Sequence, residues 1–374
     1  MPNISNEYDY LIHLVRCGIH DLQPQEPPQG LKLEWVFEYG KFHQVANIAF
    51  YSLEKLKNKP NPELYSKWQA YRDQALMCDI TQSYAAQELR DGMQARGIRF
   101  MEVQGTKLKP LYPQSDFRTM SDIDFIIDEE NIPKARELME SLGYRCETVY
   151  KVEMNGSRHP NTYVEMHTEY FLGDFEYRRV MQSPFEDADE QGQCRLNAFY
   201  LYNLLHIAKH YFYSGCGIRR VLDVYFLNQK YPDCIRDPYV KKGLKSAGIA
   251  EFAEELAGLA EDWFGYEERE FPRSAMVKYI FNSGIHGSSY NRQQYHVGER
   301  LEHTGPFAGQ RYYIRRLFGN RRDLLLRYPV LKKYWILYPF CWLHRVFSVL
   351  NPQRFKSVRR EVQIVKKMVK GDTE

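Results

Sequence analysis

The sequence predicts a mixed α/β (α+β) protein with a central mixed sheet and helical N-terminal and C-terminal extensions. Three observations support this. Apolar residues recur at helical spacing over roughly the first hundred residues, short strand-like segments follow up to Glu169, and helical spacing returns at about Leu196. Hydrophobic residues make up 44% of the 374 residues, which is enough to bury a sizeable core.

We divide the chain into four parts on this basis. They are a helical N-terminal region at 1–97, an α/β core at 98–190, a helical domain at 191–310 and a basic aromatic tail at 311–374. In the first part, Leu11, Val15 and Ile19 show helical spacing. A long helical pattern then runs from about Asn61 and stops at Gly97.

The α/β core is predicted from a change of periodicity at Ile98. The expected elements, in order, are a strand ending at Gly105, a strand at Asp122–Asp128, a helix at Asn131–Leu142 stopped by Gly143, a strand at Tyr144–Val152, a polar turn at Met154–Asn161 and a strand at Thr162–Glu169. The core is therefore expected to contain four strands.

The third part contains two amphipathic helical segments, which begin at Leu196 and at Ile218. Ser214–Gly217 separates them, further helices are expected over 240–285, and a polar stretch covers 284–310.

The composition argues against several protein classes. The seven cysteines are scattered and form no CxxC pair, which favours free thiols in a reducing cytosol over disulfides or a cysteine zinc site. The N-terminus has no basic and apolar signal pattern, and no run of about 18 apolar residues predicts a spanning helix. We therefore expect a cytoplasmic protein.

Charge is unevenly distributed along the chain. From Arg311 to Glu374 there are 16 Lys and Arg against 4 Asp and Glu, a net charge of +12. The whole chain carries +3, so the first 310 residues carry 3 − 12 = −9. An acidic body is thus joined to a basic tail.

Gly105 and Thr106 are the first candidate site residues. A glycine at a strand end, followed by a small hydroxyl residue, allows backbone N–H groups to approach a phosphate closely. By itself this pair fits an ordinary turn equally well.

Asp122 and Asp124 form the central motif. Side chains alternate along a strand, so the two carboxylates share a face while Ile123 and Phe125 point into the core. Two acids so placed repel each other unless a cation lies between them, which is the arrangement that holds Mg²⁺ beside a triphosphate. In isolation, two acids at a solvated strand edge would explain the pattern as well.

Glu165 is the third acid. It lies in the middle of the last expected strand, with Val164 and Met166 on the opposite face. If this strand lies beside the strand of Asp122 and Asp124, Glu165 completes a three-carboxylate cluster. We therefore predict that Asp122, Asp124 and Glu165 are both the catalytic and the metal-binding residues.

The order of these pieces resembles the DNA-polymerase-β-like nucleotidyltransferase superfamily. Its pattern is a strand-end glycine motif, two acids separated by one residue, and a third carboxylate on a later strand. The resemblance implies a nucleotidyltransferase fold in which the first two acids bind two Mg²⁺ ions, with Mn²⁺ as an alternative. The third acid would help to bind the catalytic metal and to activate an acceptor hydroxyl.

The match extends to an uncharacterised bacterial nucleotidyltransferase group that is often met in polysaccharide-gene neighbourhoods. The matching residues are Gly105, Leu108, Tyr112, Arg118, Asp122, Ile123, Asp124, Glu165, His167, His206, His210 and Asp223. The resemblance covers most of the chain and is strongest over about 98–230. Gln104 stands where the family often has Lys, and Lys107 or Lys109 can supply that charge, although solvated side chains are the favoured interpretation of both lysines.

Arg118, four residues before Asp122, has two equally supported interpretations. Its guanidinium can clamp a phosphate, or it can form an ion pair that keeps the two aspartates ionised. His167 shares a face with Glu165 and either orients the acceptor and accepts its proton or is a structural hydrogen-bonding residue, which the pattern favours slightly. His206 and His210 have zinc-binding spacing, but without further ligands they fit core or cleft histidines lining the acceptor site better.

The basic tail interleaves cations with aromatic residues, such as Arg327, Lys332 and Arg345 with Trp335 and Phe340. A helix packed on the acidic body is the favoured interpretation. Weak peripheral contact with a membrane comes second, and a nucleic-acid surface is disfavoured because the body is acidic.

The sequence therefore predicts metal-dependent transfer of a nucleoside monophosphate from a nucleoside triphosphate to an acceptor hydroxyl. The resemblance suggests a polysaccharide-related small molecule as the acceptor. Gly105, Thr106 and Lys107 are the expected phosphate contacts. The main alternative is a non-catalytic nucleotide-binding or scaffold protein with the same fold, and a nucleic-acid-modifying transferase is a third interpretation.

Overall fold

The structure is a computed structural model of the 374-residue chain. It describes residues 6–149, 153–160, 162–171, 175–189, 192–267, 269–285, 287, 331 and 334–347. These residues divide into two compact units. Unit 1 spans 1–211 and 216–286, and unit 2 spans 212–215 and 287–374.

The N-terminal region is helical, as predicted. It contains α1 (Glu7–Ile19), α2 (Leu33–Phe42), α3 (Ala46–Leu53) and α4 (Pro62–Ala95). The long helix α4 begins where its sequence favours a start, because the Asn61 side chain accepts the backbone N–H of Leu64 at 2.9 Å and Pro62 occupies the first turn. It ends before Gly97, whose φ of 63° is a conformation that glycine adopts without strain.

The central sheet has five strands in the order β1-β2-β5-β4-β3. They are β1 (Phe100–Glu102), β2 (Ile123–Ile127), β3 (Arg145–Val149), β4 (Glu153–Arg158) and β5 (Thr162–His167). Only the β2–β5 pair is parallel among these strands, so the sheet is mixed, as predicted. The connections include α5 (Gly105–Leu108), η1 (Lys109–Leu111), η2 (Ser115–Phe117), η3 (Glu129–Asn131) and α6 (Ile132–Ser141).

The prediction of a turn at Met154–Asn161 is wrong, because β4 occupies Glu153–Arg158 and pairs with both β3 and β5. The polar residues and Gly156 suggested a turn. In the structure Gly156 is buried where the strand passes closely over α6, and a Cβ at this position would overlap the Met139 side chain. Glycine is therefore present for close packing rather than for chain reversal.

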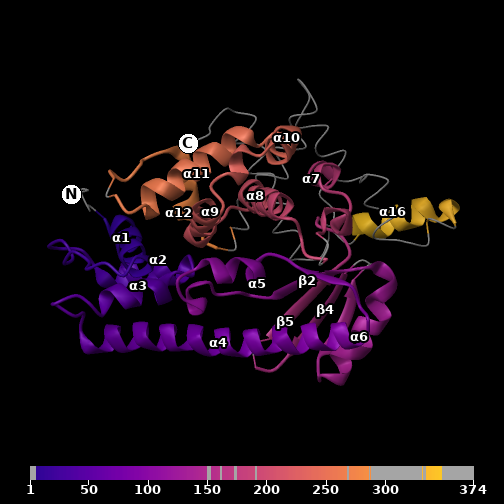
Figure 1. The fold of residues 1–374 in the computed structure, drawn as a ribbon, viewed down its shortest axis with the longest axis horizontal. Coiled ribbons are helices and arrows are strands. Elements are labelled where there is room, and N and C mark those ends of the chain that lie inside the picture. The colour runs from indigo at the N-terminus through magenta and orange to yellow at the C-terminus, as the bar shows by residue number, and fades with distance from the viewer. Residues whose placement is uncertain are drawn as a thin grey trace. The chain divides into compact units, whose positions relative to one another are not determined.

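The two faces of the sheet pack differently. On one face, apolar side chains of β2, β4 and β5 form a core with α4 and α6; its members include Ala85, Leu89, Met93, Ile123, Phe125, Leu138, Met139, Val164 and Met166. Figure 1 shows α4 running along this side of the sheet, with the helices that follow β5 on the other side. Alternation along β2 and β5 thus directs Asp124, Glu165 and His167 away from the α4 layer.

The chain after β5 forms further helices, as predicted. They are α7 (Phe175–Val180), η4 (Pro184–Asp187), α8 (Leu196–Tyr213), α9 (Ile218–Lys230), η5 (Cys234–Arg236), α10 (Pro238–Ser246), α11 (Ala250–Phe264) and α12 (Ala275–Ser283). Their buried residues share one large hydrophobic core with α1–α3 and the start of α4. Our boundaries at 97 and 191 therefore separate segments that pack together, and the four-part division of the chain stays a prediction.

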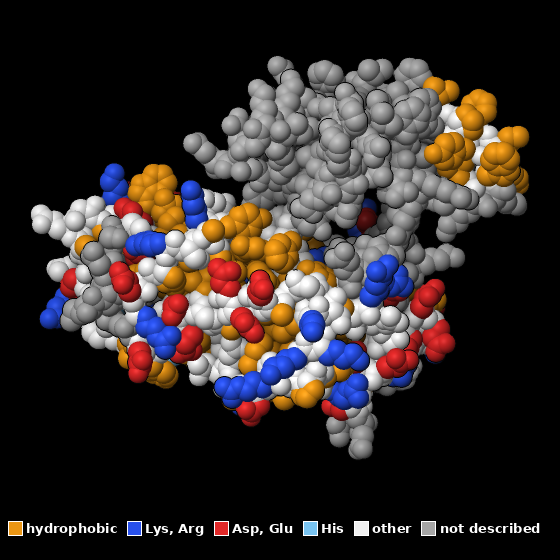
Figure 2. Space-filling model, turned by 90° about the horizontal axis from the view of Figure 1, so that it is seen from above, with side chains coloured by type: hydrophobic (Ala, Val, Ile, Leu, Met, Phe, Trp, Pro, Cys, Tyr) orange, Lys and Arg blue, Asp and Glu red, His pale blue; other side chains and the backbone are white. Residues whose placement is uncertain are grey.

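The tail is described only at 331 and 334–347, which includes η8 (Trp335–Leu337) and α16 (Tyr338–Phe347). Most of the stretch at 284–310 and most tail cations lie outside the described residues. Apolar side chains gather on the surface of this segment (Figure 2), and Trp335 and Phe340 are 81% and 68% exposed. Among the described residues, no helix is long and apolar enough to cross a membrane.

Candidate functional site

The site is built on the parallel pair β2–β5. Asp124 pairs in register with Glu165, and Ile126 pairs with His167. Parallel strands in this register place Asp124, Glu165 and His167 on the same face. The expectation that the strand of Glu165 lies beside the strand of Asp124 is confirmed.

Three side chains converge at this point. The Nε2 atom of His167 lies 3.3 Å from Oδ1 of Asp124 and 3.3 Å from Oε2 of Glu165. One ligand atom from each of the three residues lies within 4.8 Å of the others, as in a metal-binding group. Asp124 is buried, whereas Glu165 and His167 are partly exposed.

The electrostatics of this group favour a cation at its centre. Burial by itself lowers the pKa of His167, but hydrogen bonds to Asp124 and Glu165 together raise it to about 10. The pKa of Glu165 is lowered in turn, chiefly by its hydrogen bond to His167. The imidazole of His167 is therefore protonated, and its positive charge lies between the two carboxylates. A metal ion bound at this place would supply positive charge in the same way.

Asp122 lies outside that group of three but close to it. Burial, followed by the nearby charges of Asp124 and Glu165, raises the pKa of Asp122 to about 7. Arg220 and Arg219 oppose this rise. Three carboxylates therefore lie close together, and oxygen-rich donor sets of this kind suit divalent cations. The residues present therefore fit a divalent metal.

The turn after β1 contains Gly105 and Thr106. Gly105 begins the short helix α5, and a Cβ on Gly105 would lie 2.5 Å from Met120 Sδ, so a larger residue here would displace the Met120 side chain. The Thr106 hydroxyl donates to the carbonyl of Val103 at 3.2 Å and so closes the turn. Neither observation tests the proposed phosphate contact.

Gln104 adopts φ 54° and ψ −122°, which is strained for a residue other than glycine. Strained backbone of this kind is common at functional sites. The Gln104 side chain lies against the hydroxyl of Tyr202, which is buried on α8 and feels the charge of Asp124. The strained turn therefore lies beside the face of the sheet that carries Asp124, Glu165 and His167. We call this face the carboxylate face.

Two lysines near this turn have partners. Lys107 donates to Oε1 of Gln193 at 3.1 Å. Lys109 is buried and forms an ion pair with Asp79 of α4, so the idea that it replaces the missing family lysine is wrong, as is its assignment as a solvated side chain.

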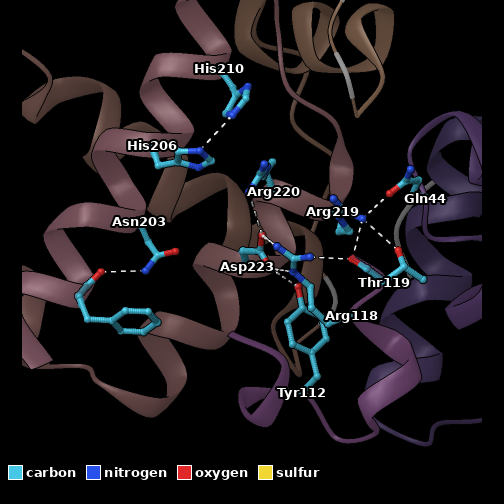
Figure 3. A network of polar contacts seen from close by, with 11 residues as sticks. Gln44, Tyr112, Arg118, Thr119, Asn203, His206, His210, Arg219, Arg220 and Asp223 are labelled. Atoms are coloured by element: carbon cyan, nitrogen blue, oxygen red, sulfur yellow. Dashed lines mark hydrogen bonds and ion pairs between the residues drawn. The ribbon is translucent and has the colours of Figure 1, made fainter. Parts of the chain in front are cut away.

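Arg118 forms an ion pair, but not with the two aspartates that its spacing suggested. It is buried against Asp223 of α9, with Nε 2.6 Å from Oδ1 and Nη2 3.1 Å from Oδ2 (Figure 3). Its remaining nitrogen, Nη1, donates to the Thr119 carbonyl at 2.7 Å. The ion-pair interpretation is thus correct in kind but wrong in partner, because a residue 105 positions away in sequence takes the place of the two aspartates.

His206 and His210 lie one turn apart on α8, with their Nε2 atoms 3.2 Å from each other. Burial, followed by the charges of His210 and Arg220, lowers the pKa of His206 well below its usual value. In the described part of the chain no third ligand joins them in a metal-binding group. His206 also feels the charge of His167, so α8 lies over the carboxylate face.

Several residues of this face were not identified from the sequence. Glu153 and Asn155 of β4 pair in register with His167 and Glu165. Oε2 of Glu153 lies 3.9 Å from Nδ1 of His167, and Oδ1 of Asn155 is buried without a hydrogen-bond partner in the described structure. Because a turn was predicted for most of this segment, the alternation of side chains along β4 was not recognised, and Glu153 and Asn155 were missed.

One of three comparisons with known proteins identifies the family of this chain. A search of the curated proteins and a search of the solved structures gave no match. A family model described as "Uncharacterised nucleotidyltransferase" matches residues 30–265, which is more than half of the chain and includes Asp122, Asp124 and Glu165. The protein therefore belongs to this family of nucleotidyltransferases and is itself a transferase of that kind.

Proposed function

We propose that the protein transfers a nucleoside monophosphate from a nucleoside triphosphate to an acceptor hydroxyl in a reaction that depends on divalent metal. The observation that carries this proposal is the register of β2 and β5, which pairs Asp124 with Glu165 and lets two carboxylates and His167 converge within 4.8 Å. The family match supports the reaction class. The family resemblance suggests a polysaccharide-related small molecule as acceptor.

Asp122, Asp124 and Glu165 would hold the metal, which we propose to be two Mg²⁺ ions with Mn²⁺ as a substitute. When bound, such ions neutralise the triphosphate and polarise the reacting phosphoryl group. Glu165, or His167 after the loss of its own proton, would accept the proton of the acceptor hydroxyl, because both side chains are partly exposed whereas Asp124 is buried.

The remaining assignments concern substrate contacts. Gly105, Thr106 and Lys107 would lie against the phosphates, and His206 and His210 would line the acceptor side. The contact of Gln104 with Tyr202, which feels the charge of Asp124, supports a place for this turn beside the proposed metal-binding residues. We withdraw Arg118 as a direct phosphate ligand because its Nε and both terminal nitrogens already bind Asp223 and Thr119.

The test is an assay of labelled nucleoside triphosphates with Mg²⁺ and a cell extract. Glu165→Gln should reduce the labelling of the acceptor by at least about 100-fold, because one carboxylate of the metal group is lost. Glu147→Gln on β3 is a matched control, since Glu147 is exposed on the same sheet, and it should retain full labelling. Equal activity in both variants would contradict the proposal, whereas nucleotide binding without any transfer by the wild type would favour a scaffold.

We also propose that the protein is cytoplasmic and that its tail contacts anionic lipid weakly. All seven cysteines are free thiols, which supports the cytoplasmic assignment. The exposed Trp335, Ile336 and Phe340 are side chains of a kind that enters a lipid interface, which supports the lipid contact. Co-sedimentation with anionic vesicles should decrease with salt and with the combined change Trp335→Ser and Phe340→Ser. Binding that is indifferent to both would contradict the lipid contact.

A further inference from the structure

Three arginines surround a single carboxylate beside the candidate site. Arg118 forms the paired contact with Asp223 described above, and Nη1 of Arg220 lies 3.9 Å from Oδ2 of the same aspartate. Arg219 is the third member, and we call Arg118, Arg219 and Arg220 the arginine cluster (Figure 3). Asp223 is fully buried, Arg118 and Arg219 are 3% and 4% exposed, and the Arg220 side chain is 12% exposed.

Within the arginine cluster, three guanidinium groups share the single carboxylate of Asp223. In the described structure, Arg219 has no carboxylate partner: its Nη1 donates to the Thr119 carbonyl at 2.8 Å, to the Thr119 hydroxyl at 3.0 Å and to the Gln44 amide oxygen. The Nε atoms of Arg219 and Arg220 are buried without a hydrogen-bond partner among the described residues. Burial, together with the charges of Arg118 and Arg220, lowers the pKa of Arg219 to about 9.

An excess of buried positive charge is costly unless an anion compensates it. Asp223 can neutralise one arginine, and Tyr112 already donates to Asp223 Oδ1 at 2.7 Å. Arg220 reaches this same carboxylate only at 3.9 Å, and Arg219 has no carboxylate partner within the described part of the protein. An anionic ligand would supply negative charge here.

The arginine cluster adjoins the carboxylate face rather than an unrelated part of the molecule. Arg220 and Arg219 both act electrostatically on Asp122, and Arg220 acts on His206 and Tyr202 as well. In Figure 3, Arg220 lies on the side of His206 and His210, whereas Arg219 reaches to Gln44 and Thr119. Arg220 is thus the member placed to meet a ligand that enters the site.

We infer that Arg220, supported by Arg219, binds the phosphate groups of the nucleoside triphosphate at this site, an inference that rests on the proposed function. A guanidinium presents paired donors that match phosphate oxygens, and a triphosphate carries enough negative charge for both arginines. Arg118 and Asp223 act as positioning residues, because their contact fixes the start of α9, from which Arg219 and Arg220 project. A phosphate on the acceptor has the same chemistry, so the test separates the two sources.

The experiment measures binding by calorimetry with Mg²⁺ and without any acceptor, using inorganic triphosphate, inorganic phosphate and the four nucleoside triphosphates as probes. The wild type should bind triphosphate more tightly than phosphate. Arg220→Gln should weaken the binding of both inorganic triphosphate and nucleoside triphosphate by about 10-fold or more and should reduce the preference for triphosphate over phosphate. Arg236→Gln, a change of an exposed arginine on η5, should leave both quantities unchanged.

Arg220→Lys is a second test variant if Arg220→Gln does not fold, because it keeps the positive charge and loses only the paired donors. It should weaken triphosphate binding by a few fold. A folded Arg220→Gln or Arg220→Lys protein with unchanged affinity and unchanged triphosphate preference would overturn the inference. A loss of affinity for inorganic phosphate alone would also overturn it, because Arg220 would then be assigned to a phosphate of the acceptor. If the wild type binds triphosphate through Arg220 but transfers nothing, the proposed function fails while this inference stands.

Discussion

At the scale of single residues, the ionisation of Asp122 opposes folding. Its pKa is raised to about 7 by burial and by the charges of Asp124 and Glu165. A folded-state pKa above the unfolded value means that ionisation destabilises the fold, and the penalty is fully present above about pH 7 and fades as the pH falls.

We therefore predict that Asp122→Asn stabilises the metal-free protein at pH 8 by roughly 1–2 kcal/mol after solvent screening, and by less at pH 5. The same change should abolish stabilisation by Mg²⁺, because a ligand is lost. Urea unfolding in EDTA and in Mg²⁺ at both pH values measures both effects. A loss of metal-free stability at pH 8 would show that Asp122 is a favourable ion-pair partner instead.

His43 provides a second prediction at the residue scale. It is fully buried, its Nδ1 accepts the backbone N–H of Ile218 at 3.3 Å, and burial lowers its pKa to about 3. Below about pH 6.5, His43 binds a proton in the unfolded state but not in the folded state. The free energy of unfolding therefore decreases as the pH falls from about 6.5 toward 3.

Between pH 7 and pH 5 this group should cost the wild type about 2 kcal/mol. The variant His43→Asn keeps a hydrogen-bond acceptor and should lose less stability over the same interval, although it is less stable at pH 7 because of its smaller side chain. Urea unfolding at several pH values gives the slope for each protein. Parallel slopes would mean that His43 is charged in the folded state.

At the scale of elements, β4 depends on one close contact. Gly156 of β4 packs against α6, and a Cβ at this position would overlap the side chain of Met139, which is itself buried. Gly156→Ala should therefore destabilise the protein by about 1–3 kcal/mol despite adding apolar surface. The combined change Gly156→Ala and Met139→Val should recover part of this loss, since the methyl group in conflict is removed.

Gly258→Ala is the matched control for that prediction. Gly258 is in helix α11, and nothing lies within 4 Å of a Cβ added there. Alanine should thus stabilise this helix by up to about 1 kcal/mol. Thermal unfolding of the two single variants and the double variant separates overpacking from helix propensity, and similar effects at both glycines would contradict the packing argument.

At the scale of the whole molecule, Asp223 joins the sheet to the helical layer. It accepts hydrogen bonds from Tyr112 and Arg118, which lie in the connection between β1 and β2, while Asp223 itself belongs to α9. Removing its charge would leave the arginine cluster without its one buried carboxylate, and an unpaired buried charge is strongly destabilising.

Asp223→Asn should therefore destabilise the protein by about 3–5 kcal/mol. Asp262→Asn, which breaks a solvent-exposed pair with Arg269, should change stability by no more than about 0.5 kcal/mol. Chemical unfolding of both variants tests the difference. A loss below about 1 kcal/mol for Asp223→Asn would mean that the cluster finds another anion or takes up water.

Much of the local structure and the centre of the candidate site could be predicted from the sequence. Gly97 and Gly143 marked the ends of α4 and α6, because the backbone at a helix end has local requirements that glycine meets. The strands of Asp124 and Glu165 could be recognised from alternation, which is also a local property. Convergence of their carboxylates then needed only that the two strands be neighbours.

The contacts between distant segments could not be predicted, because they depend on how the elements pack together. Gly156 looked like a turn residue because its packing partner, Met139, belongs to another element. Arg118 looked like a partner of nearby acids, yet the most buried carboxylate within its reach was Asp223 on α9. Arg219 and Arg220 gave no sequence signal, because an excess of charge exists only once burial removes water and brings the arginines together.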